Sequence, residues 1–454
     1  MDYESQISNL NRYIGANLPE NGTIKSIEQL IIDKARSLNL EIIKFSDCYY
    51  IKKGDNPKAL LHLNLDYSKQ TMKVSWENEG ENKIIKANFS INLITSFLVI
   101  TYLLTECSSS FDILLTHNNI HISDNKYTEI RDILRTDKII NLNLRQGSCV
   151  ADEFSGLKLL LNQVKVDRFV PDYSFKTYRL SLDDLTGGHA GEESDKVKLN
   201  SIKLLMTIIR KIKAKVDLDI VSLVGGERYD FIPSTASLDL IVNEEYEADL
   251  INIFEIVKNE TIEKNLKYEP DLKLTLVQIE NKKQDPITKE SFNHLASFIE
   301  LIPIGSYFVN SVDDQIVSSC NLATARSLRN NINLILVLRS LSDESMKAMV
   351  EKFNLAATIS SSTLTERYHI DKWKNNDNSL TDIFKSSFRE IRGEEFKVIK
   401  TQYSLDSSII FKGLNVKIIS LGVKYKKGDD VYYSFSNDIL NTIIILENVF
   451  NEIN

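Results

Sequence analysis

The sequence predicts an α/β protein in which a sheet is sandwiched by helices and an α+β domain is inserted into the chain. Three observations support this fold class. The chain has 454 residues, 43% of them hydrophobic, which is enough for two or three domains, or for one domain with a sizeable insertion. Strand-like and helical patterns are mixed along the chain. The pattern of residues 1–171 stops there and resumes after about residue 365.

The first part, residues 1–171, shows both periodicities. Apolar residues recur at helical spacing in residues 24–38, and "EIIKFSDCYYIKK" then alternates as strands do. The most apolar stretch, residues 91–107, carries interior polar residues and is shorter than the roughly 20 apolar residues of a membrane span. We therefore expect a buried helix there. Short strands are expected at residues 59–66, 72–76, 111–116 and 137–144.

The inserted part, residues 172–365, has a different pattern of strands and helices. The strand "YRLSLDDL" leads into the glycine-rich turn "TGGHAGEESD", a long amphipathic helix at residues 198–215 and the strand "DLDIVSLVGG". Strand and helix patterns then repeat at residues 236–258, 270–282, 286–300 and 332–339. These alternating elements predict an α+β domain.

The last part, residues 366–454, returns to the first pattern. It predicts the helix "SLTDIFKSSFREI", the strands "EEFKVIKTQY" and "NVKIISLGVKY", and a closing helix at residues 438–453. An insertion that splits one α/β domain explains this order.

Composition limits the classes of function. The net charge of −8 and the isoelectric point near 5.5 argue against binding of nucleic acid or acidic membranes through bulk charge. The four cysteines lack CxxC spacing and fit free thiols in a reducing compartment. The N-terminus has no basic region followed by an apolar core, so no signal peptide is expected. We expect a cytoplasmic protein that does not span or coat a membrane.

Five segments, in order, carry a resemblance to a known family. They are "LSLDDLTGGHAGEESDKVKLNSIKLL", "LVGGERYDFIPSTA", "FIELIPIGSYFVNS", "LVLRSLSDESMKAMVEKF" and "YHIDKWKNNDNSLTDIFKSSF". Together they resemble the Xaa-His dipeptidases, the aminoacyl-histidine dipeptidases and carnosinase-like enzymes of the di-zinc peptidases. The resemblance implies a zinc-peptidase-type sheet domain with an inserted lid domain.

The family's chemistry needs charged ligands. Two zinc ions about 3.5–4 Å apart share a water and polarise the scissile carbonyl, while a glutamate acts as general base. The resemblance implies a His-x-Asp at a strand end, an Asp before a helix, a Glu-Glu pair, a further Asp and a late His. Carboxylates and neutral imidazoles suit zinc, whereas amides carry no charge.

This chain departs from that pattern at nearly every position. In "KALLHLNLDYSK" the resemblance places the metal-binding His at Asn64, retains Asp66, and leaves His62 out of register. The remaining metal positions fall on Asn88, Asn118 and Asn119, Asn143 and Asp429, and a "HAGLE"-like stretch has Gln402 and Asp406 in place of His and Glu. We expect Asn64, Asn88, Asn118, Asn119 and Asn143 to converge near Asp66 as a metal site that has lost its ligands.

The glycine-rich turn contains Gly187, Gly188, His189 and Gly191. The resemblance equates His189 with a lid histidine that stabilises the reacting carbonyl oxygen. A turn histidine kept for local hydrogen bonds, between glycines required by a tight backbone path, is the simpler interpretation and the one we favour.

Other motifs give weaker signals. His117 and His121 have the i, i+4 spacing that binds a metal on a helix, but the alternation "IHIS" favours a turn into a strand. Gly225 and Gly226 lack the spacing of a phosphate loop and are better explained as the end of a strand. No GxSxG nucleophile motif is present.

The sequence therefore predicts a catalytically inactive homologue of a di-zinc Xaa-His dipeptidase, without cofactor, acting as a binding or scaffold protein. We expect a monomer whose partner is another protein. Two alternatives stay open. One is an active metallodipeptidase with remapped ligands drawn from Asp66, His62, His117 or Asp429. The other is a zinc-free binder of a small peptide or metabolite.

Overall fold

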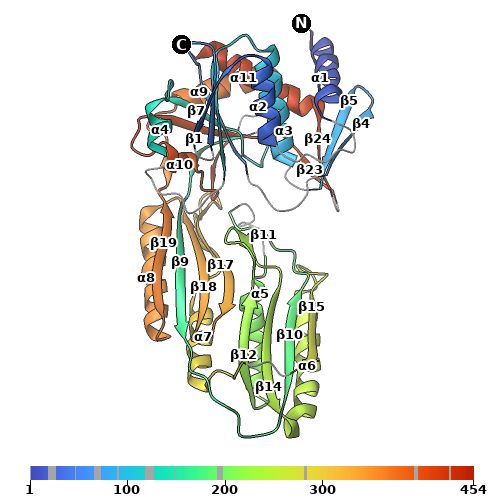
Figure 1. Ribbon diagram of the computed structural model, residues 1–454, viewed down its shortest axis with the longest axis vertical. Coiled ribbons are helices and arrows are strands. Elements are labelled where there is room, and N and C mark those ends of the chain that lie inside the picture. The colour runs from blue at the N-terminus through green and yellow to red at the C-terminus, as the bar shows by residue number, and fades with distance from the viewer. Residues whose placement is uncertain are drawn as a thin grey trace. The chain divides into compact units, whose positions relative to one another are not determined.

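The computed structural model describes residues 2–18, 27–45, 48–65, 73–88, 91–117, 127–147, 149–191, 198–280, 284–392, 397–428 and 431–453. The chain forms two compact units (Figure 1). Unit 1 consists of residues 1–153, 373–400 and 405–454, and unit 2 of residues 154–372 and 401–404. Unit 2 is thus inserted in sequence into unit 1. Each unit is described by itself.

Unit 1 is built on a large mixed sheet with the strand order β1-β2-β6-β3-β7-β22-β8-β20, in which β21 also pairs with β8. The inner neighbours β6, β3, β7 and β22 run parallel, so their carboxyl ends meet at one edge of the sheet. The strands are β1 (Glu41–Phe45), β2 (Cys48–Lys53), β3 (Leu60–Leu65), β6 (Phe111–His117), β7 (Lys138–Asn141), β8 (Cys149–Phe154), β20 (Trp373–Lys374), β21 (Lys397–Thr401) and β22 (Lys417–Leu421).

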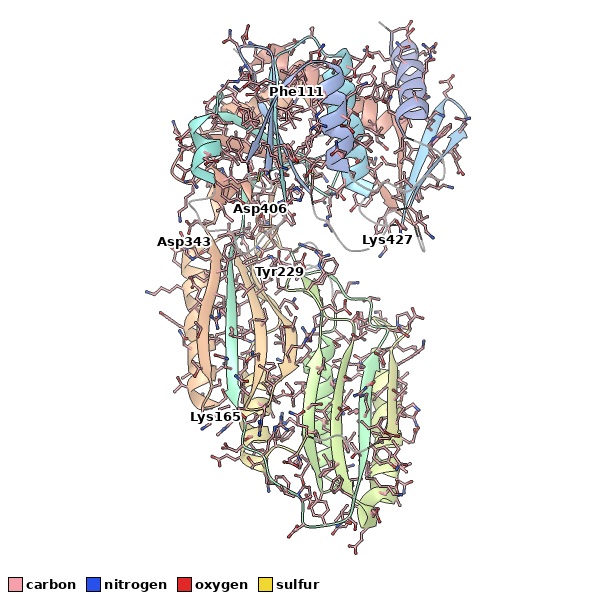
Figure 2. All side chains as sticks on the ribbon, in the orientation of Figure 1. Phe111, Lys165, Tyr229, Asp343, Asp406 and Lys427 are labelled. Atoms are coloured by element: carbon pink, nitrogen blue, oxygen red, sulfur yellow. The ribbon has the colours of Figure 1, made fainter. Side chains whose placement is uncertain are left out.

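Helices cover this sheet and supply much of its hydrophobic core. The long ones are α1 (Tyr3–Asn17), α2 (Ile27–Ser37), α3 (Ile91–Glu106), α9 (Ser379–Arg392) and α11 (Ser436–Glu452), and the short ones are α4 (Thr128–Asp132) and α10 (Ser407–Ile410). Phe111 on β6, labelled in Figure 2, belongs to the same core as residues of α1, α2, α3 and α11. The predicted helix of residues 91–107 is indeed buried along most of its length.

The polar residues inside α3 fit its burial. Thr95 and Thr101 donate hydrogen bonds to carbonyls of their own helix, and Ser96 donates to the carbonyl of Leu142 at 2.8 Å. Such bonds remove most of the cost of burying a hydroxyl. Among the described helices, none is long and apolar enough to cross a membrane.

A second, four-stranded sheet in unit 1 has the order β23-β24-β5-β4. Its strands are β4 (Val74–Glu79), β5 (Asn82–Ala87), β23 (Lys426–Lys427) and β24 (Tyr432–Phe435). We call it the small sheet. It joins segments that are far apart in the sequence, since β5 pairs with β24 in an antiparallel ladder.

Unit 2 contains an antiparallel sheet with the order β15-β10-β14-β12-β17-β18-β9-β19, and β16 also pairs with β17. Its strands are β9 (Gly156–Lys165), β10 (Phe175–Asp183), β12 (Leu218–Gly225), β14 (Ala236–Asn243), β15 (Lys273–Ile279), β16 (Gly305–Val309), β17 (Ile316–Ser327), β18 (Asn331–Ser340) and β19 (Thr363–Ile370). Helices α5 (Ser201–Lys213), α6 (Glu247–Asn265), α7 (Lys289–Leu301) and α8 (Asp343–Ile359) share its core, and a strand pair, β11 (Gly188–His189) with β13 (Phe231–Ile232), completes the unit.

The boundaries of unit 2 differ from the predicted 172–365. It begins at residue 154 because β9 pairs along its length with β18 and also with β19. It extends to residue 372 and also includes residues 401–404, which lie inside the predicted third part. Long-range strand pairing, which leaves no local signal in the sequence, decides these boundaries.

Candidate functional site

A buried group of polar side chains lies at the carboxyl ends of the parallel strands β3, β6 and β7. We call it the amide cluster and define it as His62, Asn64, Thr116, Asn141 and Asn143. Each of its members is less than a tenth exposed. The edge formed by the carboxyl ends of parallel strands is where α/β proteins commonly place binding sites.

Asn143 holds the end of β3 through its side-chain amide. Its Oδ1 accepts a hydrogen bond from the backbone N–H of Asn64 at 2.8 Å, and its Nδ2 donates to the backbone carbonyl of Asn64 at 2.7 Å. Both positions were predicted to share a site, and the structure brings them together. An aspartate at position 143 would lack the donor that the carbonyl of Asn64 requires.

Asn141 extends this network. Its Nδ2 donates to Oδ1 of Asn143 at 3.1 Å, while its Oδ1 accepts from the backbone N–H of Asn143 at 3.0 Å and from the hydroxyl of Ser420 at 2.7 Å. Donors and acceptors match without any ionised group. Sequence reasoning missed Asn141, although its position two residues before Asn143 was a signal for a second polar residue at the same strand end.

His62 is fully buried and bonded on both ring nitrogens. Nδ1 lies 2.7 Å from Oγ of Ser407 and 3.4 Å from Nδ2 of Asn141, while Nε2 lies 2.9 Å from Oγ1 of Thr116. Because the amide nitrogen can only donate, Nδ1 accepts and Nε2 carries the proton. Burial lowers the pKa of His62 from 6.5 to about 3, so its ring is neutral near pH 7.

The other predicted site residues either lie away from the amide cluster or fall outside the described residues. Asn88 is exposed at the end of β5, where it exchanges hydrogen bonds with the backbone of Lys73, so its bonds belong to the small sheet. Asp66, Asn118, Asn119 and Asp429 lie outside the described residues, as does His121. His117 ends β6, and its Nε2 lies within hydrogen-bond distance of Oε2 of Glu28 in α2.

The described residues of the amide cluster do not fit a di-zinc centre. Their only imidazole uses its acceptor nitrogen within the network, and the side-chain oxygens of Asn141 and Asn143 accept from N–H and O–H donors. Zinc needs deprotonated or imidazole ligands that offset its charge, and amide side chains supply no such charge. In the described part of the chain, no three His, Cys, Asp or Glu residues gather in a group that could hold a metal ion.

Unit 2 contains a second buried polar group around the glycine-rich turn. His189 is 7% exposed, its ring packs edge-on against Phe231 at 5.8 Å, and its Nδ1 accepts from the backbone N–H of Gly191 at 3.3 Å. These contacts agree with the interpretation that His189 serves local structure.

The backbone conformation and the close packing of this turn require glycine. Gly187 and Gly188 adopt φ values of +54° and +132°, which L side chains rarely adopt. A Cβ at Gly191 would lie 3.0 Å from the carbonyl oxygen of Gln402 and 3.2 Å from Nε of Arg339. Arg339 is buried on β18. It was not singled out in the sequence, although a lone arginine in the apolar run "LILVLRS" is a signal.

Gln402 anchors residues 401–404 to unit 2. Its side-chain nitrogen, Nε2, donates to the carbonyls of Ile316 and Val317 at 2.9 and 3.1 Å, and its Oε1 accepts from the hydroxyl of Ser319 at 3.2 Å. Its backbone carbonyl accepts from the hydroxyl of Ser155 at 2.8 Å. A glutamine supplies both the donors and the acceptor that this anchoring requires. The sequence resemblance did not predict this anchoring role.

Comparison with known proteins gives both a sequence relative and a fold. No protein-family model matches the chain. The cytosol non-specific dipeptidase of Escherichia coli (strain K12) is 25% identical over 251 residues, which make up 54% of this chain and 51% of that protein. The match therefore spans about half the length of this curated relative.

Solved structures resemble the whole chain. Aminoacylhistidine dipeptidase from Vibrio alginolyticus has a TM-score of 0.65 at 17% identity, covering 98% of this chain and 96% of that one. A tripeptidase from Staphylococcus aureus subsp. aureus mu50 has a TM-score of 0.53 at 12% identity, covering 100% of both chains. These likenesses show a shared α/β fold, and with the sequence match they confirm the predicted resemblance.

Proposed function

We propose that this chain, a relative of the Xaa-His dipeptidases with the same fold, is a catalytically inactive homologue that acts as a protein-binding or scaffold protein. The observation that carries the proposal is the amide cluster, where neutral hydrogen bonds join Asn64 and Asn143 at positions that the family fills with metal ligands. We further propose that the protein is cytoplasmic, needs no cofactor and is monomeric by itself.

Two chemical arguments support loss of catalysis. Full protein zinc sites bind with free energies of about 10 kcal/mol or more, and replacing most charged ligands by amides removes most of that energy. The resemblance also places the general base at Asn118 or Asn119. An amide cannot accept the proton of the attacking water near neutral pH.

The alternative of remapped zinc ligands is disfavoured by the described histidines. A remapped site would draw on His62 and His117 in addition to Asp66 and Asp429. The acceptor nitrogen of His62 is used by Ser407 and Asn141, and His117 pairs with Glu28. Recruiting either histidine would break these contacts before zinc could bind.

A second candidate function is zinc-free binding of a small peptide or metabolite. It is favoured by the buried cationic side chain of Arg339 beside His189 and Gly191 in unit 2. Binding of a carboxylate ligand would be lost in Arg339→Met, whereas a scaffold function at another surface would not.

Metal titration by isothermal calorimetry tests the proposal. The purified protein is titrated with Zn²⁺, Co²⁺ and Mn²⁺ at pH 7.5, beside the double variant Asn64→His/Asn143→Asp, which restores two family ligands. We expect the native chain to bind zinc no more tightly than scattered surface histidines do, and the double variant to bind more tightly. Stoichiometric zinc binding by the native chain with nanomolar affinity would refute the proposal.

A further inference from the structure

The small sheet of unit 1 has two unlike faces. Side chains alternate between the faces of a sheet, so the strand register assigns each residue to one of them. Val74, Ile85 and Ala87 belong to the core of unit 1, with Trp76 and Tyr432 packed against it. These residues define the inner face.

The other side, which we call the outer face, carries lysines and aromatic rings. Strand register places Lys426, Tyr433, Lys86 and Ser75 in one row across the four strands. The next row contains Phe435, Ile84 and Glu77, and on the opposite side of the first row Lys73 pairs with Asn88. Ile84 is buried, at 8% exposed, whereas Tyr433 and Phe435 are partly exposed.

The outer face is accessible and preorganised. Lys73 and Lys426 are exposed, and Lys86, Tyr433 and Phe435 are partly exposed. The rings of Tyr433 and Phe435 lie 6.0 Å apart at an interplanar angle of 80°, and Nζ of Lys426 lies 5.3 Å from the Phe435 ring centre.

The charge of this face differs from that of the whole chain. The outer face carries three lysines, Lys73, Lys86 and Lys426, against two acids, Glu77 and Glu79, and is therefore positive by one charge. Lys86 forms a 2.7 Å salt bridge with Glu77. The chain as a whole has a net charge of −8. A polyanion is therefore repelled by most of the surface and attracted only locally.

We propose that the outer face of the small sheet binds single-stranded nucleic acid, with Tyr433 and Phe435 contacting bases and Lys73, Lys86 and Lys426 contacting phosphates. This activity is additional to the proposed scaffold function and does not involve the amide cluster. Proteins that bind single strands without sequence preference combine a basic surface with aromatic side chains on which bases stack. A peptide of acidic residues alone would use the lysines but has no aromatic rings to stack on Tyr433 and Phe435.

Fluorescence anisotropy with fluorescein-labelled (dT)12 and (rU)12 tests this proposal on the full chain at 50 mM salt. We expect micromolar binding of at least one oligonucleotide. Each lysine that contacts a phosphate contributes about −0.7 to the slope of log K against log salt, so three lysines give about −2. Lys426→Ala should weaken binding about fivefold and reduce this slope by about 0.7.

Matched variants separate the outer face from general charge. Lys427→Ala removes the neighbouring lysine, which alternation places on the inner face over Tyr432, and should change affinity less than twofold. Tyr433→Ala should weaken binding about fivefold, and Tyr433→Phe should restore it. Circular dichroism verifies that each variant is folded.

Three results would overturn the proposal. The first is no binding of either oligonucleotide at 50 mM salt. The second is equal loss in Lys426→Ala and Lys427→Ala, which would indicate general charge. The third is equal competition by poly-glutamate of the same length, which would indicate a site for any acidic polymer.

Discussion

At the scale of single residues, the amide cluster is held together by hydrogen bonds between neutral groups. Asn143 serves as both donor and acceptor to the backbone of Asn64, and Asn141 connects this pair to His62 and Ser420. Carboxylates packed this closely without a metal would repel each other and resist ionisation. Neutral amides avoid that cost, and they give these residues a role in the stability of unit 1.

Asn143→Ala should lower the free energy of unfolding by about 3 kcal/mol. The substitution leaves the buried N–H and C=O of Asn64 without their side-chain partners, and each buried unpaired group costs roughly 1–3 kcal/mol. Urea denaturation monitored by circular dichroism measures the change. Asn88→Ala, at an exposed position of the same unit, is the matched control and should cost less than about 1 kcal/mol. Equal effects of both substitutions would refute the role assigned to Asn143.

His62 should make stability depend on pH. Its folded-state pKa of about 3 lies below its ordinary value of 6.5, so the unfolded chain binds the proton more readily. Its contribution is therefore constant above pH 6.5 and is lost as the pH falls from 6.5 toward 3. Between pH 7.5 and pH 5 the loss is on the order of 2 kcal/mol.

The variant His62→Gln, which keeps a neutral polar side chain, should lack this loss, as judged by urea denaturation at both pH values. His369→Gln, at an exposed position, is the control and should behave as the native chain does. If His62→Gln and the native chain lose the same stability between pH 7.5 and pH 5, His62 is not the neutral buried group described here.

At the scale of elements, the sequence predicted the strongly patterned segments well. The buried helix α3, the strand β3 and the closing helix α11 lie close to their expected positions. The strands β8 and β9 were missed, because their pairing partners lie far away in the chain. The strand β17 was also missed, although it pairs with the next strand, β18. The convergence of Asn64 and Asn143 was predictable from the order of strand ends. The role of Asn141 in the amide cluster was not predictable, since only the folded structure shows which donor meets which acceptor.

Gly226 illustrates an element junction that tolerates no side chain. It has a φ of +66°, and a Cβ there would lie 1.9 Å from the carbonyl oxygen of Ala323 in β17. Gly226→Ala should therefore destabilise unit 2 by about 3 kcal/mol, because both the backbone conformation and the contact are violated. Gly305 has a φ of +91° with no atom within 4 Å of such a Cβ.

Gly305→Ala thus carries only the conformational cost, about 1 kcal/mol, and is the matched control in the same unit. Thermal unfolding of both variants, with hydrogen exchange of β12 and β17 peptides, measures the difference. A Gly226→Ala protein as stable as Gly305→Ala would mean that β12 and β17 do not approach as described.

At the scale of the whole molecule, two units with separate cores are joined by a chain that passes between them at residues 153–154, 372–373, 400–401 and 404–405. The fold resembles that of the Vibrio alginolyticus aminoacylhistidine dipeptidase, while the described strand ends of unit 1 carry neutral amides. The outer face of the small sheet adds a proposed nucleic-acid surface within unit 1. We propose that this fold is kept here without peptidase chemistry.

Hydrolysis of Xaa-His dipeptides by the metal-saturated protein tests this claim most directly. The protein is loaded in turn with zinc, cobalt and manganese, and release of histidine is followed at pH 7.5 beside a protein-free control. We predict rates equal to that control, because amides at positions 64 and 143 neither hold the metals nor activate water. Turnover that disappears in Asp66→Ala and after chelation, and returns when metal is added back to the native chain, would contradict the account.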